Sequence, residues 1–268
     1  MPGAVTTTIL SGSSILSGSS KMDSKYNVMS IDIIKEVNKI PLAQIVLLDG
    51  EAPKQTFAIS DTDFFKPGNN LEIKLRYEGE TQDEATVFKG IIIKHSLQID
   101  QSSSLLIVDL KDISIKLTTQ RKSAVFRGMT DQKIIKEIVD KYGIKVTATD
   151  TKTTHKDDKE MVQYYCTDWD FILSRIDVNG LLILADDGEI TIKEPNFEEL
   201  PKHTFEYGNS DISELEMEAD IRHQYGKVKS QFWDINNQTQ ATSVAGKFDL
   251  KQGNLQGDVL SKAIGAEE

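Results

Sequence analysis

Alternating apolar and polar residues characterise the first part of the chain, from residue 26 to about residue 116. In residues 71–77 apolar side chains alternate with charged ones, so one face of a strand is apolar and the other polar. Residues 31–36 fit either a strand or a helix. Further strands are predicted where Val, Ile and Leu gather between turn-forming residues, at 43–48, 85–93 and 105–110. Short strands separated by turns predict a small antiparallel barrel or sandwich.

A helical spacing replaces this alternation after Thr130. Apolar residues recur every three or four positions up to Tyr142, and charged residues occupy the opposite face. Thr130 is suited to cap the N-terminus of a helix, and Gly143 is suited to end it. The spacing therefore predicts an amphipathic helix over residues 130–142.

A second helix, followed by a hairpin, is predicted further along. Thr167 can cap this helix, Asp170 completes a shortened capping box, and Gly180 ends the helix. Two alternating runs then lie within residues 181–193, on either side of Asp187-Gly188. Asp-Gly between two such runs predicts a β-hairpin with a type I′ turn, because that turn needs two positive φ angles.

Strands resume after His203. Ser213, Leu215 and Met217 alternate with glutamates, and residues 225–234 are the expected partner strand. The order is a block of strands, then two helices with a hairpin, then strands again. This order predicts an α+β protein and not an alternating β-α parallel sheet.

The N-terminal segment is rich in serine and glycine and contains a duplicated hexamer, Ile-Leu-Ser-Gly-Ser-Ser, at residues 9–14 and 15–20. This composition favours a flexible arm over residues 1–25. The alternative is an arm whose Ile-Leu pairs dock on a neighbouring subunit. Residues 1–20 hold no Lys or Arg, so a secretory signal peptide is not expected.

Composition narrows the possible functions. The 268 residues carry a formal net charge of −11, which argues against nucleic-acid binding because phosphates are bound by clustered Lys and Arg. A single cysteine excludes a disulfide framework and a Cys-rich zinc site. The longest apolar runs are far shorter than the ~20 residues that a membrane-spanning helix needs. No membrane span is therefore expected.

Candidate catalytic residues are few, and each has a structural interpretation. No two of His95, His155, His203 and His223 stand at a metal-ligand spacing. Cys166 lies next to a predicted helix start, but a lone cysteine in such a context is usually a small buried residue.

Two pairs of carboxylates, Asp61/Asp63 and Asp168/Asp170, suggest the acid and base of a glycosidase. Asp168 and Asp170 already suit the first turn of a helix, and Asp61 and Asp63 suit a turn. The sequence therefore predicts no catalytic, cofactor-binding or metal-binding residues, no cofactor and no enzymatic activity.

Several motifs together resemble the valine-glycine-repeat protein G (VgrG) spike family. The run 167–176, Thr-Asp-Trp-Asp-Phe-Ile-Leu-Ser-Arg-Ile, is similar to the family's Ser/Thr-Asp-x-Asp-Phe-Leu-x-Arg-Leu helix, which a glycine and a hairpin follow. The helix at 130–142 lies where that family places one. The similarity covers residues 26–240, and its downstream block comprises Gln224-Tyr225, Val228, Ser230, Trp233-Asp234 and Gln238.

The resemblance implies a trimeric hub of a contractile injection machine, such as a type VI secretion spike, a phage tail hub or an extracellular phage-tail-like particle. Each chain would supply two tube-like barrels, so that three chains match a sixfold Hcp-like inner tube. The expected domains are an arm at 1–25, a first barrel at 26–118, an insert at 119–202 and the start of a second barrel at 203–268.

The resemblance also implies partners and a location. The expected partners are further copies of the chain, the tube protein, baseplate proteins, and a spike tip or effector cargo. The chain would be made in the cytoplasm and leave it within the particle. Neither an OB-fold nor a β-helix repeat follows in the sequence, which departs from the family pattern. The alternative function is a secreted cell-wall hydrolase on a β-rich scaffold, based on the Asp pairs.

Overall fold

The computed structural model divides the chain into two compact units, residues 1–195 and 196–268. The described residues are 5–12, 19–50, 56–77, 84–100, 103–155, 160–196, 200, 202–208, 212, 214–216, 218, 228–235, 237–245 and 262–263. The described elements are mostly antiparallel strands, with two α-helices. The fold class is therefore α+β. No described helix has both the length and the apolar character that crossing a bilayer requires.

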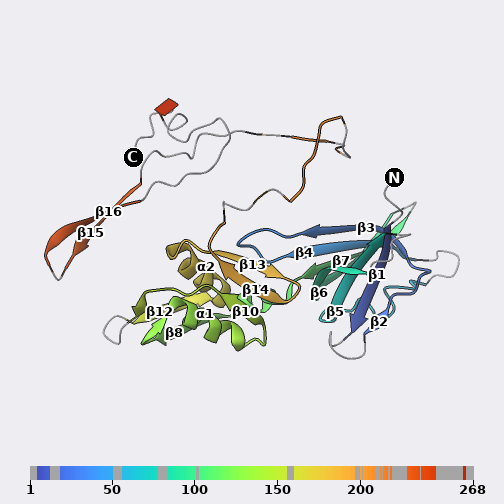
Figure 1. Cartoon of the computed structure of the whole chain (residues 1–268). Helices are drawn as coiled ribbons and strands as arrows, with labels where there is room; N and C mark the ends of the chain where they lie inside the picture. The colour runs from blue at the N-terminus through green and yellow to red at the C-terminus, as the bar shows by residue number, and fades with distance from the viewer. Residues whose placement is uncertain are drawn as a thin grey trace. The chain divides into compact units, whose positions relative to one another are not determined.

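One seven-stranded antiparallel sheet accounts for the first half of the first unit (Figure 1). Its order is β2-β1-β5-β6-β7-β4-β3. Within the described residues β2 and β3 do not pair, so this sheet is open and does not close into a barrel. Its strands are β1 (Val5–Gly12), β2 (Ser20–Lys21), β3 (Asn27–Ile34), β4 (Leu42–Leu48), β5 (Asn70–Tyr77), β6 (Ala85–Ile99) and β7 (Ser104–Lys111).

The predicted alternation sets which face of this sheet is buried. Alternate residues are buried along β4, in the first half of β5 and from Leu106 to Leu110 of β7, and Phe65 from the β4–β5 connection covers the same core. Residues 31–36, which fit two structures in the sequence, are a strand as far as Ile34. The core comprises Ile9, Ala43, Ile45, Leu47, Ile59, Phe65, Leu71, Ile73, Phe88, Ile92, Leu106, Val108 and Leu110.

The prediction of a flexible N-terminal arm is wrong for residues 5–12. These residues form β1, which pairs with β5 along its whole length, from Val5↔Tyr77 to Gly12↔Asn70. The β-branched residues before the first hexamer favour a strand, and Ile9 of that hexamer is 1% exposed in the core. Most of the second hexamer, including its Ile-Leu pair, lies outside the described residues.

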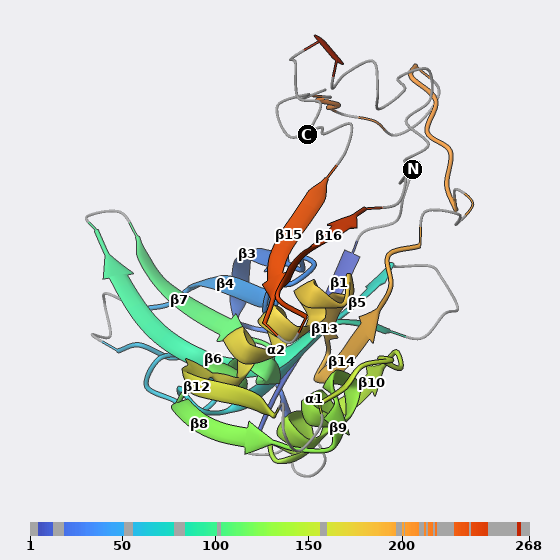
Figure 2. The same ribbon diagram turned by 90° about the vertical axis from the view of Figure 1, so that its left-hand side faces the viewer.

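Strand β6 bends where it passes from one half of the sheet to the other. Figure 2 shows it curving beside β7. It pairs with β5 only as far as Ile91, and a register shift between Ile92 and Lys94 marks the bend on the β7 side. Gly90 lies at this corner, where an added Cβ would be 2.4 Å from the backbone oxygen of Lys111. A glycine is therefore required by the close approach of two backbones.

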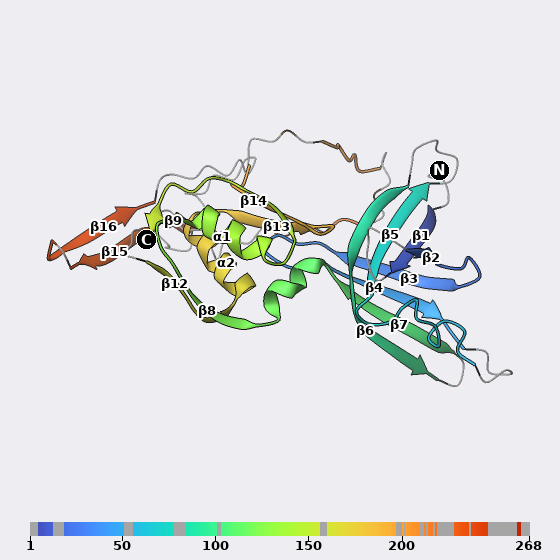
Figure 3. The ribbon, with the colours of Figure 1, turned by 90° about the horizontal axis from the view of Figure 1, so that it is seen from below.

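The second half of the first unit is a separate layered cluster. Figure 3 shows α1 and α2 side by side, between the β8–β12 ribbon and the β10-β14-β13 sheet. Strands β10 and β14 are parallel, and the other pairs here are antiparallel. The elements are η1 (Ile113–Thr118), β8 (Arg121–Phe126), β9 (Met129–Thr130), α1 (Asp131–Asp140), β10 (Lys145–Ala148), β11 (Thr154–His155), β12 (Met161–Thr167), α2 (Asp168–Val178), β13 (Leu182–Asp186) and β14 (Glu189–Lys193).

Both helices are capped as the sequence predicts, although α1 ends at Asp140, two residues before the predicted end at Tyr142. The Thr130 hydroxyl accepts a hydrogen bond from the amide of Lys133, and that of Thr167 accepts one from Asp170. Gly143 and Gly180 follow with φ of +67° and +65°. The hairpin prediction is also confirmed, because Asp187 and Gly188 have φ of +50° and +87° between β13 and β14.

The described part of the second unit contains one antiparallel hairpin, β15 (Lys229–Asp234) with β16 (Thr239–Val244). The predicted strand around Leu215 is not observed, since residues 214–216 lie outside any strand. Ser213, Met217 and Tyr225 lie outside the described residues. An alternating pattern forms a strand only where a partner strand pairs with it.

Candidate functional site

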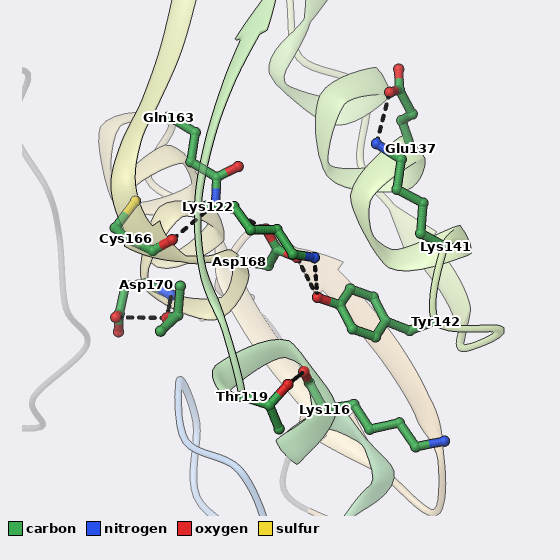
Figure 4. Close-up of polar contacts among 11 residues, drawn as sticks. Lys116, Thr119, Lys122, Glu137, Lys141, Tyr142, Gln163, Cys166, Asp168 and Asp170 are labelled. Atoms are coloured by element: carbon green, nitrogen blue, oxygen red, sulfur yellow. Dashed lines mark hydrogen bonds and ion pairs between the residues drawn. The ribbon is translucent and has the colours of Figure 1, made fainter.

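Asp168 lies at the centre of a buried polar cluster that joins four elements (Figure 4). One of its oxygens accepts hydrogen bonds from Lys122 Nζ of β8, at 2.8 Å, and from the Tyr142 hydroxyl just after α1. The other accepts one from Gln163 Nε2 of β12, at 2.9 Å. Lys122 Nζ also donates to the Tyr142 hydroxyl, at 2.6 Å. The carboxylate of α2 is thereby tied to β8, β12 and the end of α1.

The protonation states in this cluster follow from its contacts. Burial opposes ionisation of Asp168, but hydrogen bonds from Lys122, Tyr142 and Gln163 outweigh it and lower the pKa of the carboxyl. The bonds to Asp168 and Tyr142 raise the pKa of Lys122. Burial and the bond to Asp168 raise the pKa of Tyr142. At neutral pH these groups are a carboxylate, an ammonium and a phenol, which is the arrangement of a stabilising ion pair.

A second buried carboxylate, Asp131 at the start of α1, has the same architecture. It accepts two hydrogen bonds from the Arg175 guanidinium of α2, at 2.8 and 3.0 Å, and one from Nδ2 of Asn179, the residue that follows α2, at 2.9 Å. His155 Nε2 of β11 lies 2.9 Å from the same carboxylate. Burial opposes ionisation, yet these partners lower the pKa of Asp131 to about 2. The Asp131 contacts fasten α1, α2 and β11 together.

The residues of the 167–176 run thus have distinct structural roles. Thr167 caps α2, and its hydroxyl also donates to the Asp170 carboxylate at 2.6 Å. Asp168 holds the first buried cluster, and Arg175 holds the second. The sequence predicted only a helix-end role for Asp168 and missed its partners Lys122, Tyr142 and Gln163. Their separation along the chain explains why, since Lys122 precedes Asp168 by 46 residues.

The other carboxylate pair, Asp61 and Asp63, makes contacts with residues nearby in the sequence. Asp61 accepts a hydrogen bond from the amide of Phe57, at 3.3 Å, and Asp63 forms an exposed ion pair with Lys66, at 3.3 Å. Both interactions are local to one turn region. The hydrolase interpretation depended on these two Asp pairs, and each now has a structural role.

The remaining sequence candidates are dispersed. His95 Nδ1 lies 3.3 Å from the Phe65 carbonyl, His203 is exposed, and His223 lies outside the described residues. Cys166 is a half-buried free cysteine, and its backbone carbonyl accepts a hydrogen bond from the Gln163 side chain. No cluster of three or more His, Cys, Asp or Glu suited to a metal ion occurs within the described residues.

Two buried aspartates that the sequence analysis missed organise loops. Asp49 accepts hydrogen bonds from the amides of Gly50, Ile59 and Ser60, and these outweigh its burial and lower its pKa. Asp112 caps η1 and also accepts from the amide of Gly188, at 2.9 Å. The position of Asp112 before the Ile-Ser run was a usable capping signal.

The turn of the β13–β14 hairpin is docked on the large sheet. Asp187 accepts a hydrogen bond from the amide of Lys89 on β6, at 3.0 Å, and Lys35 pairs with Asp186 and Asp187. Asn38 and Ile183 exchange two hydrogen bonds, at 2.9 and 3.0 Å. A pocket of about 280 Å³ opens beside this junction, between the β3–β4 connection and Trp169. Its rim charges Glu36 and Lys39 pair with each other, at 2.9 Å.

Residues 7–268 match the protein family described as Alg8 N-terminal domain. The chain belongs to this family. No curated protein matches the chain. Among solved structures, the tail protein from Neisseria meningitidis MC58 has 12% sequence identity and a TM-score of 0.60, over 97% of this chain and 74% of that one.

Two prophage tail proteins have the same fold as this Alg8 N-terminal domain. The tail protein of prophage MuSo2 from Shewanella oneidensis has 16% identity and a TM-score of 0.53, over 70% of this chain. The chain spans about half, 53%, of that protein's length. The prophage tail protein from Listeria monocytogenes EGD-e has 11% identity and a TM-score of 0.53, over 89% of this chain and 67% of that one. The chain therefore has a fold found in phage tail proteins.

Proposed function

We propose that this chain is a structural hub of a contractile injection machine, an adaptor between a sixfold inner tube and a spike tip. The observation that carries this proposal is the shared fold with a tail protein over 97% of the chain. The buried carboxylates support it as well. Asp131 and Asp168 each join several elements of one layered cluster, and a hub that transmits force needs such a rigid body.

In this proposal three copies assemble around one axis, and each contributes two tube-like modules: residues 26–118 together with the added strand β1, and residues 203–268. The insert at 119–202 separates the two modules. Three chains then present six similar modules to the tube, which reconciles threefold and sixfold symmetry through closed interfaces. The seven-stranded sheet supports the first module, because its open edges allow neighbouring modules to complete a tube wall.

The proposed partners follow from this position. They are the other two copies, an Hcp-like inner-tube protein, baseplate proteins, and a spike tip or effector cargo. The chain is made in the cytoplasm, assembled into the particle and carried out of the cell with it.

The test is assembly of the purified full chain, alone and with the inner-tube protein of the same particle. Light scattering should give the mass of a trimer, and electron microscopy should show the chain at one end of each tube. Unrelated tubes from another particle serve as the control and should stay uncapped. A chain that remains monomeric and leaves its own tubes uncapped would refute the proposal.

A further inference from the structure

The pocket beside the β3–β4 connection is built partly on the large sheet. Its lining includes Ile34 at the end of β3, Leu42 at the start of β4 and Lys111 at the end of β7. These three residues form one row across the sheet, because Ile34 lies opposite Leu42 and Leu42 lies opposite Lys111. Leu110, the neighbour of Lys111, is buried in the core. Since successive side chains of a strand point to opposite faces, the row and the pocket lie on the face away from that core.

An indole and an aliphatic side chain complete the apolar part of the lining. They belong to Trp169 of α2 and Ile40 of the β3–β4 connection. Trp169 is 6% exposed and stands between Asp168 and Asp170 in the 167–176 run, yet its side chain takes no part in the cap of α2 or in the buried polar clusters. The pocket volume of about 280 Å³ is at the lower end of the range for ligand sites. It therefore suits a group about as large as one amino-acid residue.

Lys111 supplies this pocket with a cation. Its side chain is half-buried and forms no ion pair or hydrogen bond with any residue that the structure describes. The other charges of the lining, Glu36 and Lys39, pair with each other. The carboxylates on either side of Lys111 in the sequence are also engaged, because Asp109 accepts from a glutamine of β4 and Asp112 accepts from two backbone amides. The Lys111 ammonium can therefore pair with an anion that enters the pocket.

Asn38 adds a neutral donor to the same lining. Its backbone amide donates to the Ile183 carbonyl, and its Oδ1 accepts from the Ile183 amide. Its Nδ2 group donates to none of the described residues, so it can bind a carbonyl oxygen. The pocket thus offers apolar surface, one cation and one amide donor. An apolar side chain, a carboxylate and a peptide carbonyl occur together at the C-terminal residue of a polypeptide.

We propose that this pocket binds the C-terminal residue of a partner polypeptide that ends in an apolar residue. The terminal carboxylate pairs with Lys111, and the last peptide carbonyl accepts a hydrogen bond from Asn38. The apolar side chain packs against Trp169 and Leu42. All the lining residues belong to the first unit, and the inference goes beyond the proposed hub and does not depend on it.

The fluorescence of Trp169 tests the pocket in the full chain. Trp169 and Trp233 are the two tryptophans of the sequence, so the variant Trp233→Phe reports on Trp169 alone. N-acetyl-leucine carries all three groups of a chain end and should change this fluorescence saturably, with a Kd of about 1 mM. N-acetyl-leucinamide lacks the negative charge, and isocaproate lacks the peptide carbonyl. Each of these two should bind about tenfold more weakly or worse.

Each ligand can contradict a different part of the proposal. The absence of any saturable response to N-acetyl-leucine would refute the site. Equal binding of N-acetyl-leucinamide would refute the recognition of a carboxylate. Equal binding of isocaproate would indicate a site for free carboxylic acids and refute the assignment to a polypeptide end.

A substitution at Lys111 provides the second test, in the same Trp233→Phe background. Lys111→Met keeps an unbranched apolar side chain but removes the charge, and it should weaken the binding of N-acetyl-leucine about tenfold or more. Lys133→Met removes the same charge from the exposed face of α1 and should leave the Kd unchanged. Equal binding by a folded Lys111→Met variant would refute the role of Lys111. If circular dichroism shows that this variant does not fold, the comparison of the three ligands decides the question.

Discussion

At the scale of single residues, Asp168 contributes more than a favourable charge in the first turn of a helix. Asp168 is 3% exposed, and its carboxylate accepts hydrogen bonds from Lys122, Tyr142 and Gln163. We expect Asp168→Ala to reduce the free energy of unfolding by about 2–3 kcal/mol, because it leaves these donors without their acceptor. Asp170 lies two residues away and is exposed. The substitution Asp170→Ala should therefore reduce the free energy of unfolding by less than about 1 kcal/mol. Urea denaturation of both variants measures the difference, and equal losses would contradict the role of the buried cluster.

Asp131 makes the stability of the chain sensitive to acid. Its pKa in the folded chain, about 2, lies below the ordinary value of 3.8, so the folded state binds fewer protons than the unfolded state. The resulting stability, about 2 kcal/mol, is fully present above about pH 5 and is lost as the pH falls towards 2. We expect the Asp131→Asn variant to be less stable than the wild type at pH 7. Its free energy of unfolding should, however, fall less than that of the wild type when the pH is lowered. Urea denaturation at several pH values between 7 and 2.5 measures how the free energy of unfolding of each protein depends on pH. The same pH dependence in wild type and variant would contradict the assignment of this acid sensitivity to Asp131.

At the scale of elements, Gly90 permits the bend of β6. A Cβ at this position would lie 2.4 Å from the Lys111 carbonyl oxygen and 2.7 Å from the Phe88 ring. We expect Gly90→Ala to destabilise the chain by about 1–3 kcal/mol, because two backbones must separate. Thermal unfolding, monitored by circular dichroism, measures this loss of stability. Ser96→Ala on the same strand is the control and should change the midpoint little.

A buried acceptor, Asp112, is one of the contacts that hold the β13–β14 hairpin in place. Asp112 is 1% exposed, and its carboxylate accepts hydrogen bonds from the backbone amides of Ser114 and Gly188. Asp112→Ala should therefore raise hydrogen exchange at the hairpin amides at least about tenfold, the equivalent of ~1.4 kcal/mol. Lys35→Ala removes only the partly exposed ion pairs with Asp186 and Asp187 and should have a much smaller effect. A larger rise in hydrogen exchange for Lys35→Ala than for Asp112→Ala would contradict this role of Asp112.

Elements with a local signal could be predicted from the sequence, and contacts between distant segments could not. The period of two in β4, β5 and β7, the caps at Thr130 and Thr167, and the Asp187-Gly188 turn are all encoded within a few residues. In contrast, β1 pairs with a strand that lies 58 (Gly12↔Asn70) to 72 (Val5↔Tyr77) residues further along the chain, and its own serine-rich surroundings resemble a linker. The partners of Asp131 and Asp168 likewise come from separate elements, so no spacing in the sequence indicates them.

At the scale of the whole molecule, the first unit contains every buried hydrophobic residue of the described chain, from Ile9 to Ile192. A fragment of residues 1–195 should therefore fold on its own, with a thermal midpoint close to that of the full chain. A fragment of residues 26–195 lacks β1 and should be much less stable, because β5 then loses one of its two partner strands and Ile9 leaves the core. Circular dichroism of the two fragments measures this difference. Equal midpoints would mean that β1 is dispensable, and residues 1–25 would then be the loosely attached arm that their composition suggests.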